Sequence, residues 1–493
     1  MRNSSLVLWT ALLASSSISA PAQASMPDAV GLGARWQALG GGSVARVDDG
    51  TAALVNPAGL AGANTRRLSL GGFGAQPRVA PLPQLAWDTN QDGVVDARDG
   101  GLDWQPTPPS IGAVDLSLAG PLLPWLGAGV TLTAPTANLI RFATFDPQLP
   151  TYIRWSNRTQ RTHLAFGVAA QPIDGVRLGV AIDVLAQGVA TARMTVDAVA
   201  SGEDGTTTAV FDVHDIDLRV IPTWAPVLGA QFDLGSAHPA LEPITIGVRY
   251  HAQVGLPLDV ALDVQANANL DDFGDSEPYV AALVASADLA LFDHYVPHQL
   301  DGGASLRLGP GLVLHGDVRW MDWRRLVLNV AQVERAELLV PLLGQVDGIT
   351  DGNPYSATAK STFGARVGGE GTVALPAPRG LDRASLSVRI GGMLDPTPLV
   401  SQTSASSMLD SDHRVFTAGL GLDVVPTSPR VGPLALDVTL QVHQLAPANL
   451  PRAVDPTTAG APLRPGGLPI GGTFVALGAA LRFEGLGAPA AAP

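Results

Sequence analysis

Apolar and polar side chains alternate along several segments of the chain. In the segment 434–443, Leu or Val fills every even position, whereas Asp437, Thr439, Gln441 and His443 fill odd ones. A period of two places the two sets on opposite faces of a β-strand. The same pattern recurs in 176–187, 244–251, 312–320 and 383–390. We therefore expect many strands, each with one apolar face and one polar face.

Short and long connections separate these segments. The short ones include 173–175, 309–311 and 426–432, and the long polar ones are 136–160, 264–277, 333–357, 400–412 and 446–465. Alternation alone also fits a soluble β-sandwich, whose apolar faces meet each other. Short turns at one end and long loops at the other are instead the layout of outer-membrane barrels, which have an even number of strands. The sequence predicts an all-β fold, a transmembrane antiparallel β-barrel of about 14 strands.

The last predicted strand ends in an aromatic residue. Its apolar set is Thr473, Val475, Leu477, Ala479, Leu481 and Phe483. A terminal strand that ends in Phe resembles the signal read by the barrel-assembly machinery, which is therefore an expected partner. Residues 484–493 are rich in Ala and Pro and are expected to form a flexible tail.

Composition supports a strand-rich fold in an exported protein. The 493 residues are 46% hydrophobic and include 55 Gly and 40 Pro, too many for a helical bundle. Beyond the first few dozen residues, no apolar run is long enough for a spanning helix. The chain has no Cys, so disulfides do not stabilise it, and its formal net charge of -14 disfavours nucleic acid as a partner.

The N-terminus has the pattern of a secretory signal peptide. Arg2 precedes the apolar stretch 6–13, and Ala22-Gln23-Ala24 is a small-x-small cleavage motif. We expect cleavage after Ala24 and export, finally to the bacterial outer membrane. A buried N-terminal helix is the alternative. No Cys follows the apolar stretch, which excludes a lipoprotein anchor.

The segment after the signal peptide resembles a known family. Residues 31–50 are rich in Gly and Ala and end in an acidic pair, and Asn56-Pro57-Ala58 follows. This order is similar to the N-terminal hatch of the FadL-type outer-membrane channels for hydrophobic substrates. Further similarities lie at 296–297, 317–323, 389–398 and 410–414.

The resemblance implies a plugged barrel that carries hydrophobic molecules. The expected parts are a hatch (25–65), a barrel (66–483) with an outer insertion (76–109), and the tail (484–493). The implied function is passive uptake of small hydrophobic molecules, such as long-chain fatty acids or aromatic hydrocarbons, by a monomer. Exit into the bilayer and exit through a rearranged hatch are both left open. The hatch motif Asn56-Pro57-Ala58 is either a point of conformational change or an anchor for the plug.

Four arginines lie on the polar register of their strands: Arg177, Arg249, Arg319 and Arg389. Members of the family often place basic side chains where a fatty carboxylate binds, and a guanidinium can hold a carboxylate with two parallel bonds. These four are therefore candidate substrate-binding residues. The alternative is that they pair with inward acids such as Asp183, Asp317 and Asp437.

The outer insertion contains a calcium-binding motif. Residues 88–99 fit the Asp-x-Asn-x-Asp-Gly loop, with Gly93 at the sharp bend. The expected ligands are Asp88, Asn90, Asp92, the Val94 carbonyl, Asp96 and Asp99. A bound Ca²⁺ would stiffen an outer loop, and an acidic turn without metal is the alternative. Acidic residues elsewhere in the long loops, such as Asp271 and Asp272, could likewise hold cations next to lipopolysaccharide or simply be solvated.

The sequence offers no constellation typical of an enzyme. It contains neither His-Glu-x-x-His nor Cys-x-x-Cys, and Gly274-Asp275-Ser276 resembles a lipase nucleophile only superficially. We therefore expect a protein without enzymatic activity. The main rival to a channel is a barrel that does not transport and serves as a secretion, assembly or structural partner in the outer membrane.

Overall fold

The computed structural model describes most of the chain from residue 30 onward. The described residues are 30–42, 44–86, 101–108, 110–136, 150–152, 162–200, 207–270, 279–326, 332–340, 344–347, 359–400, 402, 408–428, 431–451 and 467–485. The predicted calcium loop, 88–99, lies outside them.

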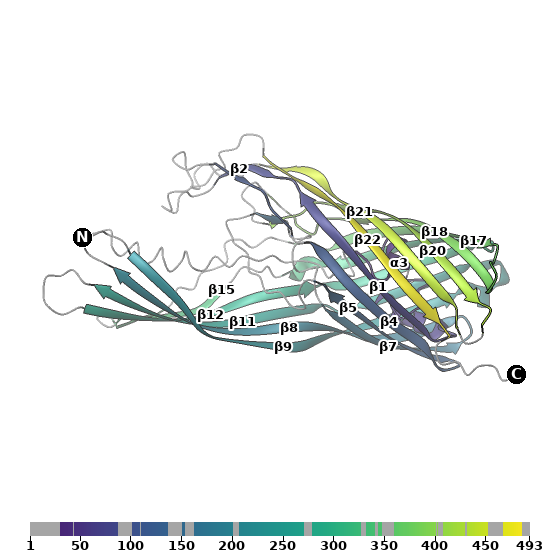
Figure 1. Ribbon diagram of the computed structural model, residues 1–493, viewed down its shortest axis with the longest axis horizontal. Coiled ribbons are helices and arrows are strands. Elements are labelled where there is room, and N and C mark those ends of the chain that lie inside the picture. Colours follow the sequence, from purple (N-terminus) through teal and green to yellow (C-terminus); the bar gives the residue numbers. More distant parts are fainter. Residues whose placement is uncertain are drawn as a thin grey trace.

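Fourteen strands close into a barrel (Figure 1). They are β1 (Arg67–Val79), β4 (Ile111–Leu123), β5 (Leu126–Pro135), β7 (His163–Ile173), β8 (Val176–Ala200), β9 (Thr207–Asp233), β10 (Ile244–His251), β13 (His298–Leu308), β14 (Leu312–Asp322), β17 (Thr362–Leu375), β18 (Leu381–Asp395), β20 (His413–Pro426), β21 (Leu434–Leu450) and β22 (Leu468–Glu484). Each pairs antiparallel with its neighbours, and β22 pairs with β1 to complete the ring. The predicted barrel is confirmed.

The period of two separates an apolar outside from a polar inside. On β21, Val438 is 46% exposed, whereas the neighbouring Asp437 is 2% exposed. The same alternation holds on β8, β10 and β14, where large apolar side chains face outward and polar ones are buried. A soluble protein would bury the apolar set, because exposing it to water is unfavourable. This outer surface is suited to lipid.

The two ends of the barrel differ. Tight turns join β7 to β8 at Asp174-Gly175 and β13 to β14 at 309–311, and Gly175 and Gly309 adopt positive φ values of 75° and 73°. We call this the turn end, and it also contains the short helices η4 (Leu234–Ser236) and η5 (Pro239–Leu241). The opposite end, the loop end, has the long connections. They include β2 (Leu82–Ala86), β3 (Gly101–Trp104), β6 (Thr151–Tyr152), β19 (Met408–Leu409) and η6 (Trp323–Arg325).

A second group of strands extends past the barrel at the loop end (Figure 1). There β8 and β9 continue beside β11 (Val254–Leu270), β12 (Tyr279–Val296), β15 (Gln332–Val340) and β16 (Gly344–Asp347), and β11 runs parallel to β8. The predicted loops 264–277 and 333–357 are therefore wrong in part, since 264–270 and much of 332–347 are strand. The backbone N–H and C=O groups of β11 are paired with β8 and β12. The polar composition of 264–270 gave no indication of this strand.

β1 also runs further than predicted. It ends at Val79, so residues 76–79 belong to the barrel and not to the outer insertion. Beyond Ala75, β1 pairs with β22 alone, and such an edge tolerates Pro77, which lacks a backbone donor. Among the described residues, no helix is both long and apolar enough to cross a membrane.

The described residues 30–42 and 44–65, here called the hatch, lie inside the barrel. They include α3 (Ala34–Gln37), α4 (Ala52–Val55) and η1 (Pro57–Gly62), which contact strands around much of the ring. Trp36, Leu39 and Leu60 are buried against small barrel side chains, among them Ala119, Ala165 and Ala169. The hatch backbone approaches the barrel very closely at Gly127 and Gly247, where a Cβ atom would overlap the carbonyl oxygens of Leu60 and Val44. Backbone thus packs directly on backbone, which only glycine permits.

Candidate functional site: the hatch and the lumen

Asn56 fastens the hatch to the barrel wall. Its side-chain amide donates to the carbonyls of Val44 at 2.6 Å and Ala230 at 3.1 Å, and its Oδ1 accepts from the Ala58 N–H at 3.1 Å. It also caps η1, which begins at Pro57, where a missing N–H costs nothing. Asn56 is fully buried. In this structure the contacts of Asn56-Pro57-Ala58 are those of an anchor.

Replacing Asn56 should loosen the hatch. In Asn56→Ala, the Val44 and Ala230 carbonyls and the Ala58 N–H each lose a buried hydrogen bond, although Val44 keeps the one from Gln231 at 3.1 Å. We expect a destabilisation of about 2 kcal/mol. Hydrogen exchange of the amides in 44–62 would rise. Asn56→Asp keeps the acceptor for the Ala58 N–H and loses the two bonds to the carbonyls of Val44 and Ala230. Its effect on exchange should therefore isolate the contribution of these two bonds. Unchanged exchange in Asn56→Ala would contradict the anchoring role.

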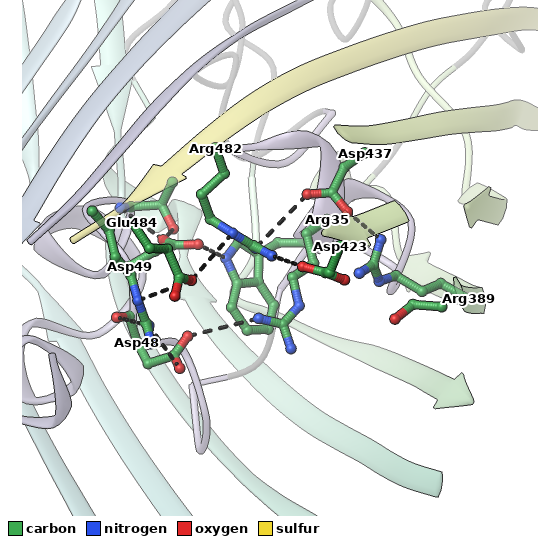
Figure 2. A network of polar contacts seen from close by, with 12 residues as sticks. Arg35, Asp48, Asp49, Arg389, Asp423, Asp437, Arg482 and Glu484 are labelled. Atoms are coloured by element: carbon green, nitrogen blue, oxygen red, sulfur yellow. Dashed lines mark hydrogen bonds and ion pairs between the residues drawn. The ribbon is translucent and has the colours of Figure 1, made fainter. Parts of the chain in front are cut away.

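An ion-pair network, here called the seam network, ties the hatch to the strands that close the barrel (Figure 2). Its members are Arg35 and Asp48 of the hatch, Arg67, Glu370, Arg389, Asp423, Asp437, Arg482 and Glu484. Arg35 holds Glu370 through two bonds of 2.9 and 3.1 Å. Arg67 on β1 bridges Asp48 at 3.0 Å and Glu484 on β22 at 3.3 Å. The first and last strands are thus linked to each other and to the hatch.

The hatch acids of this region are well compensated. Burial alone would raise the pKa of Asp48, but Arg67 and Arg35 more than offset it and hold the pKa below its ordinary value. The neighbouring Asp49 accepts from the Trp36 indole at 2.9 Å and from the Thr51 N–H at 3.0 Å. The hatch therefore carries its acidic pair in a fixed arrangement at neutral pH.

All four candidate arginines engage acids. Arg177 contacts Asp233 at 2.6 Å, and Arg249 contacts Asp301 at 2.8 Å. Arg319 also pairs with Asp301. Arg389 lies between Glu370 and Asp437, at 2.6 Å from each. Arg249 and Arg319 therefore lie together on either side of Asp301, whereas Arg177 and Arg389 lie elsewhere on the lumen wall. These ion pairs agree with the alternative raised from the sequence. Of the acids named there, only Asp437 is a partner, because Asp183 contacts histidines and Asp317 accepts from the hatch N–H of Val44.

A small cavity of about 30 Å³ lies between the hatch and the barrel wall. Asp183 stands at its edge between two imidazoles, with the His163 Nδ1 and the His251 Nε2 each 3.2 Å from its carboxylate. All three side chains are almost completely buried. Among the described residues, the opposite ring nitrogens, His163 Nε2 and His251 Nδ1, find no hydrogen-bond partner. Arg249 and Asp317 also line this cavity.

The inner face of the barrel changes character toward the loop end. On β21 the inward side chains Asp437, Thr439, Gln441 and His443 are followed by Leu445. On β8 the inward Asp183 is followed by Leu185, and on β14 Arg319 is followed by Met321, with Trp323 of η6 directly after the strand. On these three strands the inner face is therefore polar beside the hatch and apolar toward the loop end, whereas Gln299, Thr362 and His413 keep polar side chains at the loop ends of β13, β17 and β20.

One apolar group, here called the outer cluster, is covered by the loop-end connections. It includes Phe73, Ile111, Leu445, Ile470 and Phe474 of the barrel together with Leu82, Tyr152 and Leu409. The Tyr152 hydroxyl accepts from the Gly471 N–H at 3.1 Å, and β6 pairs with β19. Burial raises the pKa of Tyr152 to about 12, so its phenol stays neutral. The connections close over this part of the lumen.

The sequence reading missed this apolar lining. Its signal was present, because Leu185, Met321 and Leu445 continue the polar register of their strands with apolar side chains. Within the described residues, no group of three or more His, Cys, Asp or Glu side chains is arranged to hold a metal ion. The six predicted calcium ligands lie in the undescribed stretch 87–100.

Comparisons with known proteins identify the fold. No family model matches the sequence, and no curated protein matches it either. Among solved structures, a FadL homologue from Pseudomonas aeruginosa covers 95% of this chain and 100% of its own, with 15% identity and a TM-score of 0.53. The monoaromatic hydrocarbon channel CymD (11% identity, TM-score 0.48) covers 93% of this chain and 98% of its own. The toluene transporter TodX from Pseudomonas putida (13%, 0.48) covers 93% and 99%. The chain has the fold of the FadL homologue.

Proposed function

We propose that this chain is an outer-membrane channel through which small hydrophobic molecules, such as long-chain fatty acids or aromatic hydrocarbons, enter bacteria by passive diffusion past the hatch. The observation that carries the proposal is the change of the inner face on β8, β14 and β21 from polar side chains beside the hatch to apolar ones toward the loop end, where the outer cluster also lies. An apolar molecule gains roughly 25 cal/mol for each Å² that it removes from water on such a lining. A polar solute gains nothing there and meets the hatch.

The proposed location follows from the outer surface. Its apolar residues need lipid, and the loop end would face the outside of the cell among lipopolysaccharide. The ring leaves no unpaired barrel edge that would require a second copy, which supports a monomer. Export after cleavage at Ala24 and insertion by the barrel-assembly machinery complete the proposal. It assigns the chain no catalytic step.

Uptake into proteoliposomes tests this function. Vesicles containing the full mature chain should accumulate a labelled long-chain fatty acid or a labelled aromatic hydrocarbon faster than protein-free vesicles. They should exclude a labelled sugar. Deletion of 25–64 should abolish this selectivity. Equal permeation by the sugar would indicate an ordinary porin, and no uptake of either hydrophobe would favour the secretion or assembly partner.

Calcium binding by residues 88–99 is a separate prediction. The described strand β2 ends at Ala86, and its antiparallel partner β3 begins at Gly101. The motif between them would therefore close a β-hairpin at the loop end. An exported loop of this kind should bind Ca²⁺ with a dissociation constant of about 10⁻⁴ M. Calorimetry on the whole protein should lose this signal in Asp92→Ala and keep it in Asp382→Ala, which changes an exposed acid on another strand. Absence of a calcium signal in the unmodified chain would sink the prediction.

A further inference from the structure

The cavity beside Asp183 has groups that await a hydrogen-bond donor. A carboxylate can only accept, so the nitrogens of His163 and His251 that face Asp183 carry the protons. When both rings are neutral, His163 Nε2 and His251 Nδ1 are acceptors, and neither has a partner. The Oδ1 of Asp317 lacks one too. Buried polar groups rarely stay unsatisfied, so something that donates hydrogen bonds belongs in this cavity.

The size of the cavity restricts its occupant. A volume of about 30 Å³ has room for a water molecule or two. A hydroxyl group fits such a space and donates one hydrogen bond while it accepts another. Arg249 also lines the cavity, and its Nε has no partner among the described residues. This N–H could donate to the oxygen of the hydroxyl group.

The charged groups around the cavity disfavour the binding of an anion. The guanidinium groups around the cavity are already engaged, Arg249 and Arg319 with Asp301 and Arg366 with the Gly41 carbonyl at 3.0 Å. A carboxylate would face the lone pairs of both imidazoles and the oxygens of Asp183 and Asp317, which repel it. A neutral donor avoids this repulsion.

A buried apolar cluster adjoins the polar cavity. Val296 lines the cavity and also belongs to a buried cluster with Leu185, Ala225 and Val254. These residues come from β8, β9, β11 and β12, at the loop end of the lumen. A molecule with a hydroxyl head and an apolar body would place its head beside His163 and His251 and its body against this cluster, whose side chains are at most 3% exposed and would move apart to admit it.

We propose that this cavity is a head-group subsite that selects neutral hydroxylated hydrophobes, such as long-chain alcohols or phenols, over carboxylate anions. The inference rests on the proposed channel function and names its substrate class. One of the two rings, through His163 Nε2 or His251 Nδ1, accepts the hydroxyl hydrogen bond, and Asp183 fixes both rings. The four candidate arginines then keep their ion pairs and hold the wall together.

Matched amphiphiles test the subsite. Equilibrium binding of labelled dodecanol, its methyl ether and dodecanoate is measured at pH 8 on proteoliposomes containing the full mature chain, as the excess over protein-free vesicles. Dodecanol should bind about tenfold more tightly than the ether, the effect of one hydrogen bond. It should also bind more tightly than dodecanoate.

Two variants remove the acceptors and keep the bonds to Asp183. His163→Asn retains a donor near the Nδ1 position, and His251→Gln retains one near the Nε2 position. In the variant that removes the accepting ring, the affinity for dodecanol should fall toward that of the ether, while ether binding stays unchanged. His413→Gln is the control, because His413 pairs with His443 away from this cavity.

Each outcome decides the proposal. Dodecanoate binding as tight as dodecanol, or an alcohol preference that survives in both variants, would overturn it. Uptake of hydrophobes without head-group preference would overturn the subsite and leave the channel standing. If vesicles take up no hydrophobe at all, the proposed function itself fails.

Discussion

Proteoliposomes that contain Gly247→Leu should admit sugars that the unmodified chain excludes. A Cβ atom at Gly247 would overlap the carbonyl of Val44 and crowd the backbone of Ala45, neither of which can rotate away as a side chain could. The hatch would then lose its backbone contact with β10 at Val44 and Ala45. A barrel of this strand number without its plug encloses a wide polar lumen, so sugar-driven swelling should rise by roughly tenfold or more.

Gly302→Leu is the matched control for this variant. Gly302 lies on β13, directly beside β10 in the same wall, and a Cβ atom there meets nothing within 4 Å. Swelling in sugar should stay at the level of the unmodified chain. Both variants must show the heat-dependent gel shift of a folded barrel. A folded Gly247→Leu that still excludes sugar would show that the hatch does not depend on this contact.

Arg389→Met should cost the barrel about 3 kcal/mol of unfolding free energy. Arg389 is almost completely buried and compensates Glu370 and Asp437, each at 2.6 Å. Without it, these carboxylates keep only Arg35 at 2.9 Å and Arg482 at 3.7 Å. Urea unfolding from lipid vesicles, followed by tryptophan fluorescence, measures the loss.

Two companion variants bracket this result. Arg379→Met changes an exposed arginine in the turn between β17 and β18 and should alter the unfolding free energy by less than about 0.5 kcal/mol. Adding Asp437→Asn to Arg389→Met removes one uncompensated charge and should recover part of the loss. If Arg389→Met proved as stable as Arg379→Met, the seam network would not stabilise the barrel.

The barrel was predictable because its strands have a single strong signal. On β21 every outward residue from Leu436 to Val442 is apolar and every inward one from Asp437 to His443 is polar, so the period of two is visible without any partner. The extension at the loop end was not predictable in this way. Segment 264–270 mixes Ala with Asn and Gln, and its strand depends on pairing with β8, which is distant in sequence.

The site was predictable in its parts and less so in its connections. The residue types on the polar register identified Arg389 and Asp437 as inward, and the structure brings these two together. No sequence rule placed His163 and His251 on either side of Asp183, because the three come from different strands whose register is set by the closed ring. Local pattern thus gives the face of a residue, and ring closure decides its partner.

The account depends most on lipid around the apolar faces and an enclosed, plugged interior behind them. Because the chain has no Cys, a fluorophore can be attached at one introduced cysteine, either at Val438 or at the adjacent Thr439. In vesicles with lipids that carry a quencher in the acyl chain, the label at 438 should be strongly quenched and the label at 439 should not. Equal quenching at both positions, or at neither, would contradict the architecture and with it the channel.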